Sequence, residues 1–152
     1  MVNFASISTF RTRLAALLKV KRGVYAGVPE EICLAFKNIP IEQIRQNRDM
    51  VLMNNDSVVI KLRLPDKKQH LSKADGYRLI YLVLKEEPAV ILLDVYPKRG
   101  PSQQLDIDDV EIQRLVEEFY SELDASKLIA HDINDHLKEI VKEGTEEQGS
   151  EE

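Results

Sequence analysis

The stretch of sequence that decides the fold is VVIKLRL (58–64), PDKKQHLSKAD (65–75), GYRLIYLVLK (76–85), EEP (86–88), AVILLDVY (89–96) and PKR (97–99). Three apolar runs of strand length alternate with polar connections, which is typical of consecutive antiparallel strands. Apart from Arg78 in the second run and Asp94 in the third, these two runs are apolar on both faces, as expected of central strands. Basic residues recur where the runs begin and end. The stretch therefore predicts an antiparallel sheet with cations gathered at one end.

Pairing the three runs brings the basic side chains together. If Val83 lies opposite Val90 in a tight hairpin, Arg78 lies opposite Val95. An antiparallel return of the first run brings Arg63 close to Arg78. Because alternate side chains of a strand share a face, the basic residues of the first run lie on the face opposite its apolar residues. We therefore expect five basic residues to converge at this end of the sheet: Lys61, Arg63, Arg78, Lys98 and Arg99.

Such a cluster has two interpretations. Like charges that meet on a sheet cost stability unless an anion lies among them. Phosphate is the simplest such anion, and RNA is the simplest polymer that carries phosphates. In the alternative, the cations extend into solvent or form ion pairs with nearby acids, namely Asp66, Asp75 and Asp94.

The segments IKLRL (60–64), GYRLIY (76–81) and LLDVYPKR (92–99) resemble the RelE/HigB/ParE superfamily of bacterial toxin–antitoxin toxins, most closely its RelE-like ribonuclease branch. The resemblance covers residues 4–105 and is sharpest over the strands. It implies an α+β, RelE-like fold, in which two N-terminal helices pack on a small antiparallel β-sheet. It further implies a type II toxin that enters the ribosomal A site, cleaves mRNA as an endoribonuclease and inhibits translation.

The resemblance also assigns roles to residues. Lys61 and Arg63 match the basic residues of the KLR strand, Arg78 matches the catalytic arginine of the GYR element, and Arg99 matches the arginine after the last strand. RNA cleavage needs a base, a stabiliser of the phosphorane charge and an acid. Lys61 is the expected base, Arg63 and Arg78 the expected phosphate ligands, and Arg99 orients the leaving side. Further RNA contacts are expected from Lys98, Tyr96, Arg45 and Arg48.

Some of these residues also fit positions in the fold that make no contact with RNA. Tyr96 also fits the core, and Arg45 and Arg48 also fit a solvated helix face. Two positions depart from the family pattern, because no tyrosine follows the basic pair in residues 100–105 and Val59 replaces an upstream lysine. Two alternative functions therefore stand beside the nuclease: a ParE-like gyrase inhibitor, and a non-catalytic binding protein on the toxin fold.

The charge of the chain is divided between its two parts. Residues 1–105 carry 17 Lys and Arg against 10 Asp and Glu, and residues 106–152 carry 4 against 16, which together give the net charge of −5. We predict a toxin-like domain (1–105), a C-terminal helical extension (106–142) and a disordered acidic tail (143–152). The extension could cover the basic cluster as a built-in inhibitor, extend the core, or form a homodimer through its helices.

The remaining segments predict scaffold. A short strand is expected at 4–7, with helices at 9–21, 29–37 and 41–48 before the sheet and at 106–123 and 125–141 after it. Ser8 is the expected N-cap of the first helix, and the histidines at 131 and 136 are expected on the surface. A lone cysteine and the lack of a signal or membrane-length apolar run favour the cytoplasm. We expect no cofactor, no metal and no membrane contact. The expected partners are mRNA on the ribosome and a cognate antitoxin protein.

Overall fold

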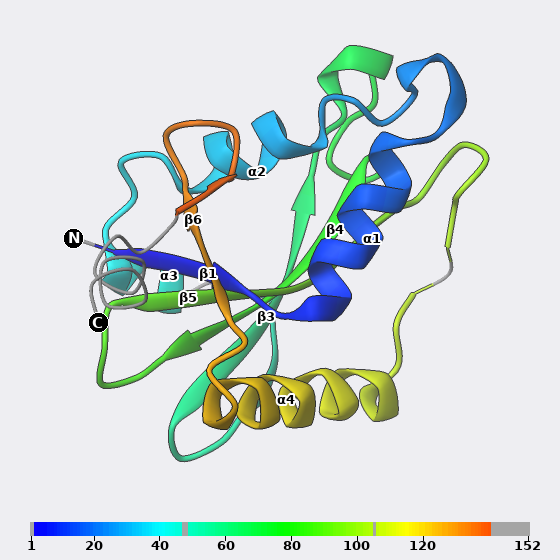
Figure 1. The fold of residues 1–152 in the computed structure, drawn as a ribbon. Helices are drawn as coiled ribbons and strands as arrows, with labels where there is room; N and C mark the ends of the chain where they lie inside the picture. The colour runs from blue at the N-terminus through cyan, green and yellow to red at the C-terminus, as the bar shows by residue number, and fades with distance from the viewer. Residues whose placement is uncertain (1, 47–48, 105, 141–152) are drawn as a thin grey trace, which may run out of the picture.

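The computed structural model describes residues 2–46, 49–104 and 106–140. Within these ranges, a twisted seven-stranded sheet carries helices, with strand order β2-β3-β4-β5-β1-β6-β7 (Figure 1). The elements are, in chain order, β1 (Asn3–Ser6), α1 (Ser8–Leu18), the 3₁₀ turn η1 (Lys21–Gly23), α2 (Val28–Phe36), α3 (Ile41–Arg45), β2 (Met50–Met53), β3 (Ser57–Leu64), the 3₁₀ turn η2 (Lys67–Gln69), β4 (Tyr77–Leu84), β5 (Ala89–Pro97), α4 (Asp109–Asp124), β6 (Ile129–Asp132) and β7 (Lys138–Glu139).

The expected antiparallel block is formed by β3, β4 and β5. Val83 pairs with Val90, as the hairpin predicts. Farther along, the register shifts between Ile80 and Tyr81, so that Arg78 lies opposite Tyr96 instead of Val95. One extra residue on β5 causes this one-residue error, because a bulge adds a residue to one strand without adding one to its partner.

The α+β class is confirmed, but the sheet is larger than the small antiparallel sheet that we expected. Outside the β3–β5 block, β2 pairs with β3, and β1 pairs parallel to β5. The parallel pair and the additional edge strand are both absent from the expected arrangement. Strands β2 and β1 add to the block because the outer edges of β3 and β5 carry backbone N–H and C=O groups that need hydrogen-bond partners.

The C-terminal extension is only partly helical. Helix α4 occupies the first of the two expected helical segments. The second expected helix, 125–141, is wrong: β6 pairs antiparallel with β1, and β7 pairs with β6. The open edge of β1 offers backbone partners that an isolated helix would leave unused. The expected end of this segment and the acidic tail (143–152) lie outside the described residues.

The start of α1 is capped from a distance. Ile7 is its N-cap and makes no side-chain cap, so the expected capping role of Ser8 is wrong. Instead, the backbone N–H of Ser8 donates to both carboxylate oxygens of Glu122 on α4, at 3.0 and 3.2 Å. Glu118 accepts from the backbone N–H and the hydroxyl of Thr9, at 3.0 and 2.6 Å. Helix α4 thus supplies the anions that the N-terminus of α1 needs.

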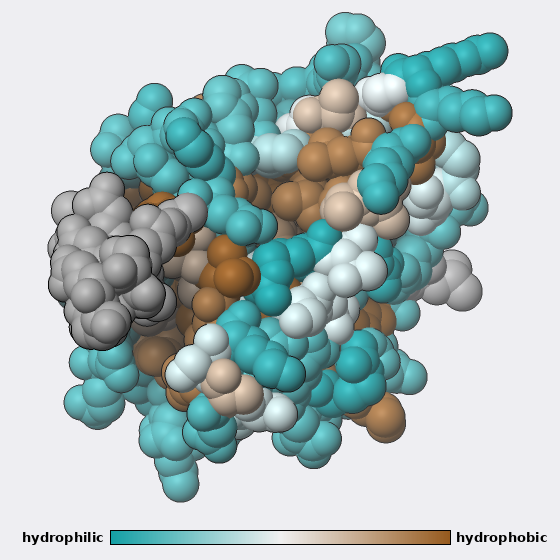
Figure 2. All heavy atoms as spheres, viewed as in Figure 1, coloured by the Kyte–Doolittle hydropathy of each residue, from teal (hydrophilic) through white to brown (hydrophobic). Residues whose placement is uncertain are grey.

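Aromatic side chains fill the core beneath α2. Phe36 contacts both Phe4 and Tyr81, with ring centroids 5.2 and 5.0 Å apart, and Tyr25 meets Tyr77 at 6.1 Å. The amphipathic helix α4 buries a second group of side chains, Ile112, Leu115, Val116 and Phe119. On the face shown in Figure 2, hydrophobic side chains are seen mainly between α1 and α2. None of the helices in the described ranges is long and apolar enough to cross a membrane.

His131 is another correction. We expected a surface residue, but it is 5% exposed on β6. One ring nitrogen lies 2.7 Å from the hydroxyl of Ser6 and the other 2.8 Å from the carbonyl of Leu137. Burial lowers the pKa of His131. His136 is exposed, as expected, and lies beside Asp135.

Asp94 gives the first testable prediction, because burial raises its pKa to about 6 despite the opposing charge of Arg13. Above pH 6 the carboxylate is charged in both states, so burial destabilises the folded protein. As pH falls from about 6 toward 4, only the folded state takes up the proton, and the penalty disappears. We expect Asp94→Asn to be about 3 kcal/mol more stable than the wild type at pH 8, and about equally stable near pH 4.

Urea denaturation at pH 4, 6 and 8 measures this difference. Asp56→Asn is the matched control, since Asp56 is an exposed turn residue, and its stability relative to the wild type should not vary in this way. An Asp94→Asn effect that is equal at all three pH values would contradict the prediction.

Candidate basic site

The three basic residues of β3 and β4 lie on one face of the sheet. Arg63 pairs directly with Arg78, and Lys61 pairs with Ile80 two residues farther along. Tyr96 lies opposite Arg78 on β5, and the two residues that follow this strand are Lys98 and Arg99. In the structure these residues lie at one end of the sheet, as the sequence predicted. We call this group the basic sheet end: Lys61, Arg63, Arg78, Lys98 and Arg99.

Arg78 is anchored within the protein. Its side chain is buried, and its guanidinium donates to the backbone carbonyls of Lys73, Tyr77 and Ala74 at 3.0, 3.2 and 3.0 Å. Burial, followed by the neighbouring charge of Arg63, lowers the pKa of Arg78. The carbonyl oxygens offset the cost of placing this cation opposite another one. Arg78 thus holds the connection between β3 and β4 against the sheet.

Lys61 and Arg99 are both paired with acids. The ammonium of Lys61 lies 3.2 Å from the carboxylate of Asp106, and the guanidinium of Arg99 lies 2.6 Å from that of Asp75. Asp75 is one of the acids that the sequence offered for such pairs. Both ion pairs are partly exposed, so another anion can replace either carboxylate at little cost in free energy.

Arg63 presents a free charge. Among the described residues, its exposed guanidinium makes no hydrogen bond or ion pair. It lines a hollow of about 310 Å³ together with Lys67, Lys73 and the acid Glu31, and with the apolar side chains of Leu34 and Leu62. The carboxylate of Glu31 accepts the backbone N–H of Lys67 at 2.9 Å. The three cations outnumber the one carboxylate in this lining, and an apolar wall lies beside them, so the hollow suits an anion that also carries a flat or apolar group.

Tyr96 belongs to the core, but its hydroxyl reaches the site. The residue is fully buried, and burial raises its pKa. Its hydroxyl donates to Asp106 at 3.1 Å and accepts the backbone N–H of Ile107 at 3.3 Å. The buried ring of Tyr96 agrees with the core placement that the sequence also allowed, and its hydroxyl is placed to hold an anion beside Lys61.

The two arginines of the 41–48 segment do not join the site. Arg45 donates to the carbonyls of Leu84 and Glu87, at the hairpin between β4 and β5. That hairpin lies at the other end of these strands from the basic sheet end, so Arg45 does not contribute to this site. The guanidinium of Arg45 instead stabilises the hairpin by binding these two carbonyls. Arg48 lies outside the described residues.

Two residues at the site were missed by the sequence reasoning. Tyr25 donates its hydroxyl to the carbonyl of Arg99 and accepts the N–H of Ser102, both at 2.9 Å, which fixes the chain just after β5. Asp106 contacts Lys61 and Tyr96. The sequence signal for Asp106 was its place at the start of the acidic extension, where we read a charge pattern and not an individual contact.

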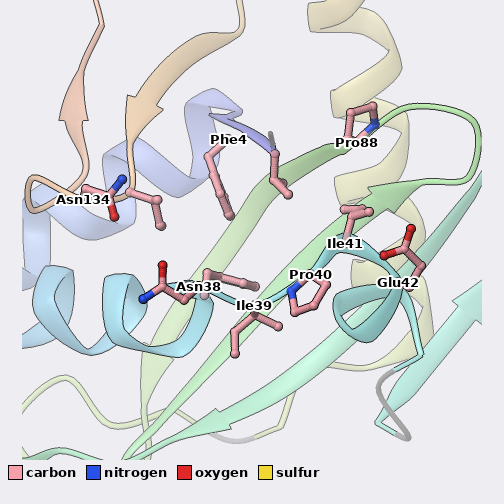
Figure 3. Close-up of a pocket in the computed structure, with 11 residues that line it drawn as sticks. Phe4, Asn38, Ile39, Pro40, Ile41, Glu42, Pro88 and Asn134 are labelled. Carbon is pink, nitrogen blue, oxygen red and sulfur yellow. The ribbon is translucent and has the colours of Figure 1, made fainter.

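A second hollow lies at the opposite end of β5 and carries little charge. It measures about 540 Å³ and lies between β1, the α2–α3 connection and the β6–β7 turn (Figure 3). Phe4, Ile39, Pro40 and Pro88 line it, with Glu42 as the charged residue of its wall. Its lining offers no cation for a phosphate, so the basic sheet end is the stronger candidate.

The chain matches no protein-family model and no curated protein.

Proposed function

We propose that this chain is a RelE-like toxin of a type II toxin–antitoxin system, which cleaves mRNA in the ribosomal A site and so inhibits translation. The observation that carries the proposal is the cross-strand pair of Arg63 and Arg78, with Lys61 on the same face. Among the described residues, backbone carbonyls accept from Arg78 but not from Arg63, so the exposed guanidinium of Arg63 is open to an anion, and guanidinium groups match phosphate in geometry. The RelE-like fold is part of this proposal, and the antiparallel block β3-β4-β5 supports it.

The exposure and the partners of each basic residue determine its proposed role. Arg63, which is exposed and unpaired among the described residues, makes the first phosphate contact. Arg78 fixes the strand end and adds positive potential from within. Lys61 and Arg99 exchange their carboxylate partners for RNA, after which Lys61 serves as the base and Arg99 faces the leaving group. A cognate antitoxin would act by covering this end.

A non-catalytic RNA-binding protein is the second candidate, and Arg78 favours it. Three backbone carbonyls occupy this guanidinium, which leaves two of its five N–H donors for a substrate. A catalytic arginine must instead direct donors at the charge that develops in the transition state. Binding without cleavage needs only the exposed cations.

In vitro translation with mapping of mRNA ends tests the proposal. The wild type should produce cuts that require the ribosome, and Arg63→Gln should lower the cleavage rate at least about tenfold, since it removes a charge-assisted phosphate contact. Lys85→Gln is the matched control: it removes the same charge at the β4–β5 hairpin and should leave cleavage unchanged.

The other outcomes separate the alternatives. RNA binding that is lost in Arg63→Gln, without cleavage by any folded protein, would replace the nuclease by the binding protein. Inhibition of DNA supercoiling without mRNA cuts would point to a gyrase-directed relative. Absence of ribosome-dependent cuts from the folded wild type contradicts the nuclease in either case.

A further inference from the structure

The basic sheet end already holds an anion, which comes from the chain itself. One oxygen of the Asp106 carboxylate lies 3.2 Å from the ammonium of Lys61, and the other accepts the hydroxyl of Tyr96 at 3.1 Å. Lys98 adds a third electrostatic attraction. Although partial burial acts in the opposite direction, the hydrogen bonds from Lys61 and Tyr96 lower the pKa of Asp106. The carboxylate is therefore firmly ionised at neutral pH.

We propose that Lys61, Tyr96 and Lys98 form a phosphate subsite of the basic sheet end, and that Asp106 occupies it until an RNA phosphate displaces its carboxylate. This inference rests on the proposed RNA-directed function. It adds to that function the residues of one subsite and an internal competitor for it. The competitor is a single side chain and not the whole acidic extension.

The donors of this subsite fit a phosphate as well as a carboxylate. An ammonium and a phenol hydroxyl donate to any anionic oxygen, and a phosphodiester has two such oxygens, as a carboxylate does. The N–H of Ile107 donates to the same Tyr96 hydroxyl, which leaves the phenol proton free to point at the anion. The geometry that holds Asp106 would hold a phosphate oxygen in its place.

Exchange requires only a local movement. The side chain of Asp106 is 60% exposed, whereas Ile107 next to it is buried and stays bound to Tyr96. The carboxylate can rotate into water while α4 remains on the sheet. A partly exposed ion pair of this kind contributes at most about 1 kcal/mol, so an RNA phosphate with several cationic contacts can outcompete it.

The test compares Asp106→Asn with Asp109→Asn. Both variants remove one negative charge, but Asp109 is exposed in the first turn of α4, and among the described residues it has no contact with Lys61 or Tyr96. The probe is a short fluorescein-labelled single-stranded RNA, and binding is followed by anisotropy at low salt. We expect about fivefold tighter binding by Asp106→Asn and less than twofold by Asp109→Asn.

A double-mutant cycle shows whether the gain acts through the subsite. In a Lys61→Met background, Asp106→Asn should no longer improve binding, because the cation that Asp106 blocks is gone. Thermal melting of each variant verifies that it is folded, and the exposure of Asp106 predicts little change.

Each result decides the matter. Equal effects of Asp106→Asn and Asp109→Asn, or a gain that persists with Lys61→Met, would overturn the subsite. If the subsite is overturned but the wild type binds RNA and the Arg63→Gln variant does not, the proposed function stands without the subsite. If no variant binds RNA while all are folded, the subsite is overturned, and the presence or absence of ribosome-dependent mRNA cuts decides the proposed function separately.

Discussion

Phe119→Ala is expected to lower the free energy of unfolding by about 3–5 kcal/mol. Phe119 is fully buried on α4, in contact with Tyr120, and its removal leaves a cavity that the neighbouring elements cannot close. Because small domains are stable by only about 5–15 kcal/mol, the loss is a large part of the total. Urea denaturation followed by circular dichroism measures it.

The control for this substitution lies on the same helix. Val110 is 79% exposed, so Val110→Ala removes apolar atoms without opening a cavity and should change stability by less than about 0.5 kcal/mol. If Phe119→Ala were no more destabilising than Val110→Ala, α4 would be a loosely attached appendage and not part of the core.

This prediction bears on the acidic extension as an inhibitor. Residues 106–140 supply the caps of α1, the partner of the β1 edge and the Phe119 side chain. Cutting the chain after residue 105 would therefore damage the fold before it uncovered any site. The extension can regulate the basic sheet end only through side chains that move without α4, and Asp106 is such a residue.

The central strands could be predicted because their signal is local. The run 77–84 is apolar on both faces except at Arg78 and is bounded by Gly76 and a short acidic turn, and the structure places β4 at those bounds. The pairing of Val83 with Val90 follows from the length of the turn. The bulge beyond it could not be predicted, since either strand can accommodate an extra residue and only the packing on both faces selects one.

The C-terminal strands could not be predicted because their partner is distant in sequence. Leu128, Ile129 and Ile133 fit a helical period, yet β6 pairs with β1 more than a hundred residues earlier. The spacing of apolar residues cannot show that an edge strand lacks a partner. The burial of His131 could not be predicted for the same reason, because one of its two contacts, Ser6, is distant in sequence.

The cations of the site could be predicted from the sequence, but of their acidic partners the sequence offered Asp75 and not Asp106. Strand alternation and pairing brought Arg63 and Arg78 together, because both rules are geometric. The anions arrive from loops: Asp75 from the β3–β4 connection and Asp106 from the segment before α4. Loop conformation depends on contacts such as the hydroxyl of Tyr25 on Arg99, which no periodicity encodes.

Gly76→Ala is expected to destabilise the protein by about 3 kcal/mol or more, because the added Cβ would collide with the backbone at the end of β3. A Cβ here would lie 2.2 Å from the carbonyl oxygen of Leu64, 2.8 Å from the carbonyl carbon of Pro65 and 2.9 Å from the backbone nitrogen of Asp66. These are backbone atoms, which cannot rotate away as a flexible side chain does. The ends of β3 and β4 would have to separate where Arg63 faces Arg78.

A second glycine provides the comparison. At Gly27 the added Cβ would meet only the side chain of Lys68, at 3.7 Å, which is ordinary contact, and its φ of −84° suits any residue. Gly27→Ala should therefore change the urea midpoint little, while Gly76→Ala lowers it strongly. Similar midpoints for the two variants would mean that β3 and β4 can spread apart at the basic sheet end. The glycine of the GYR element would then not be the residue that fixes the spacing of the two arginines.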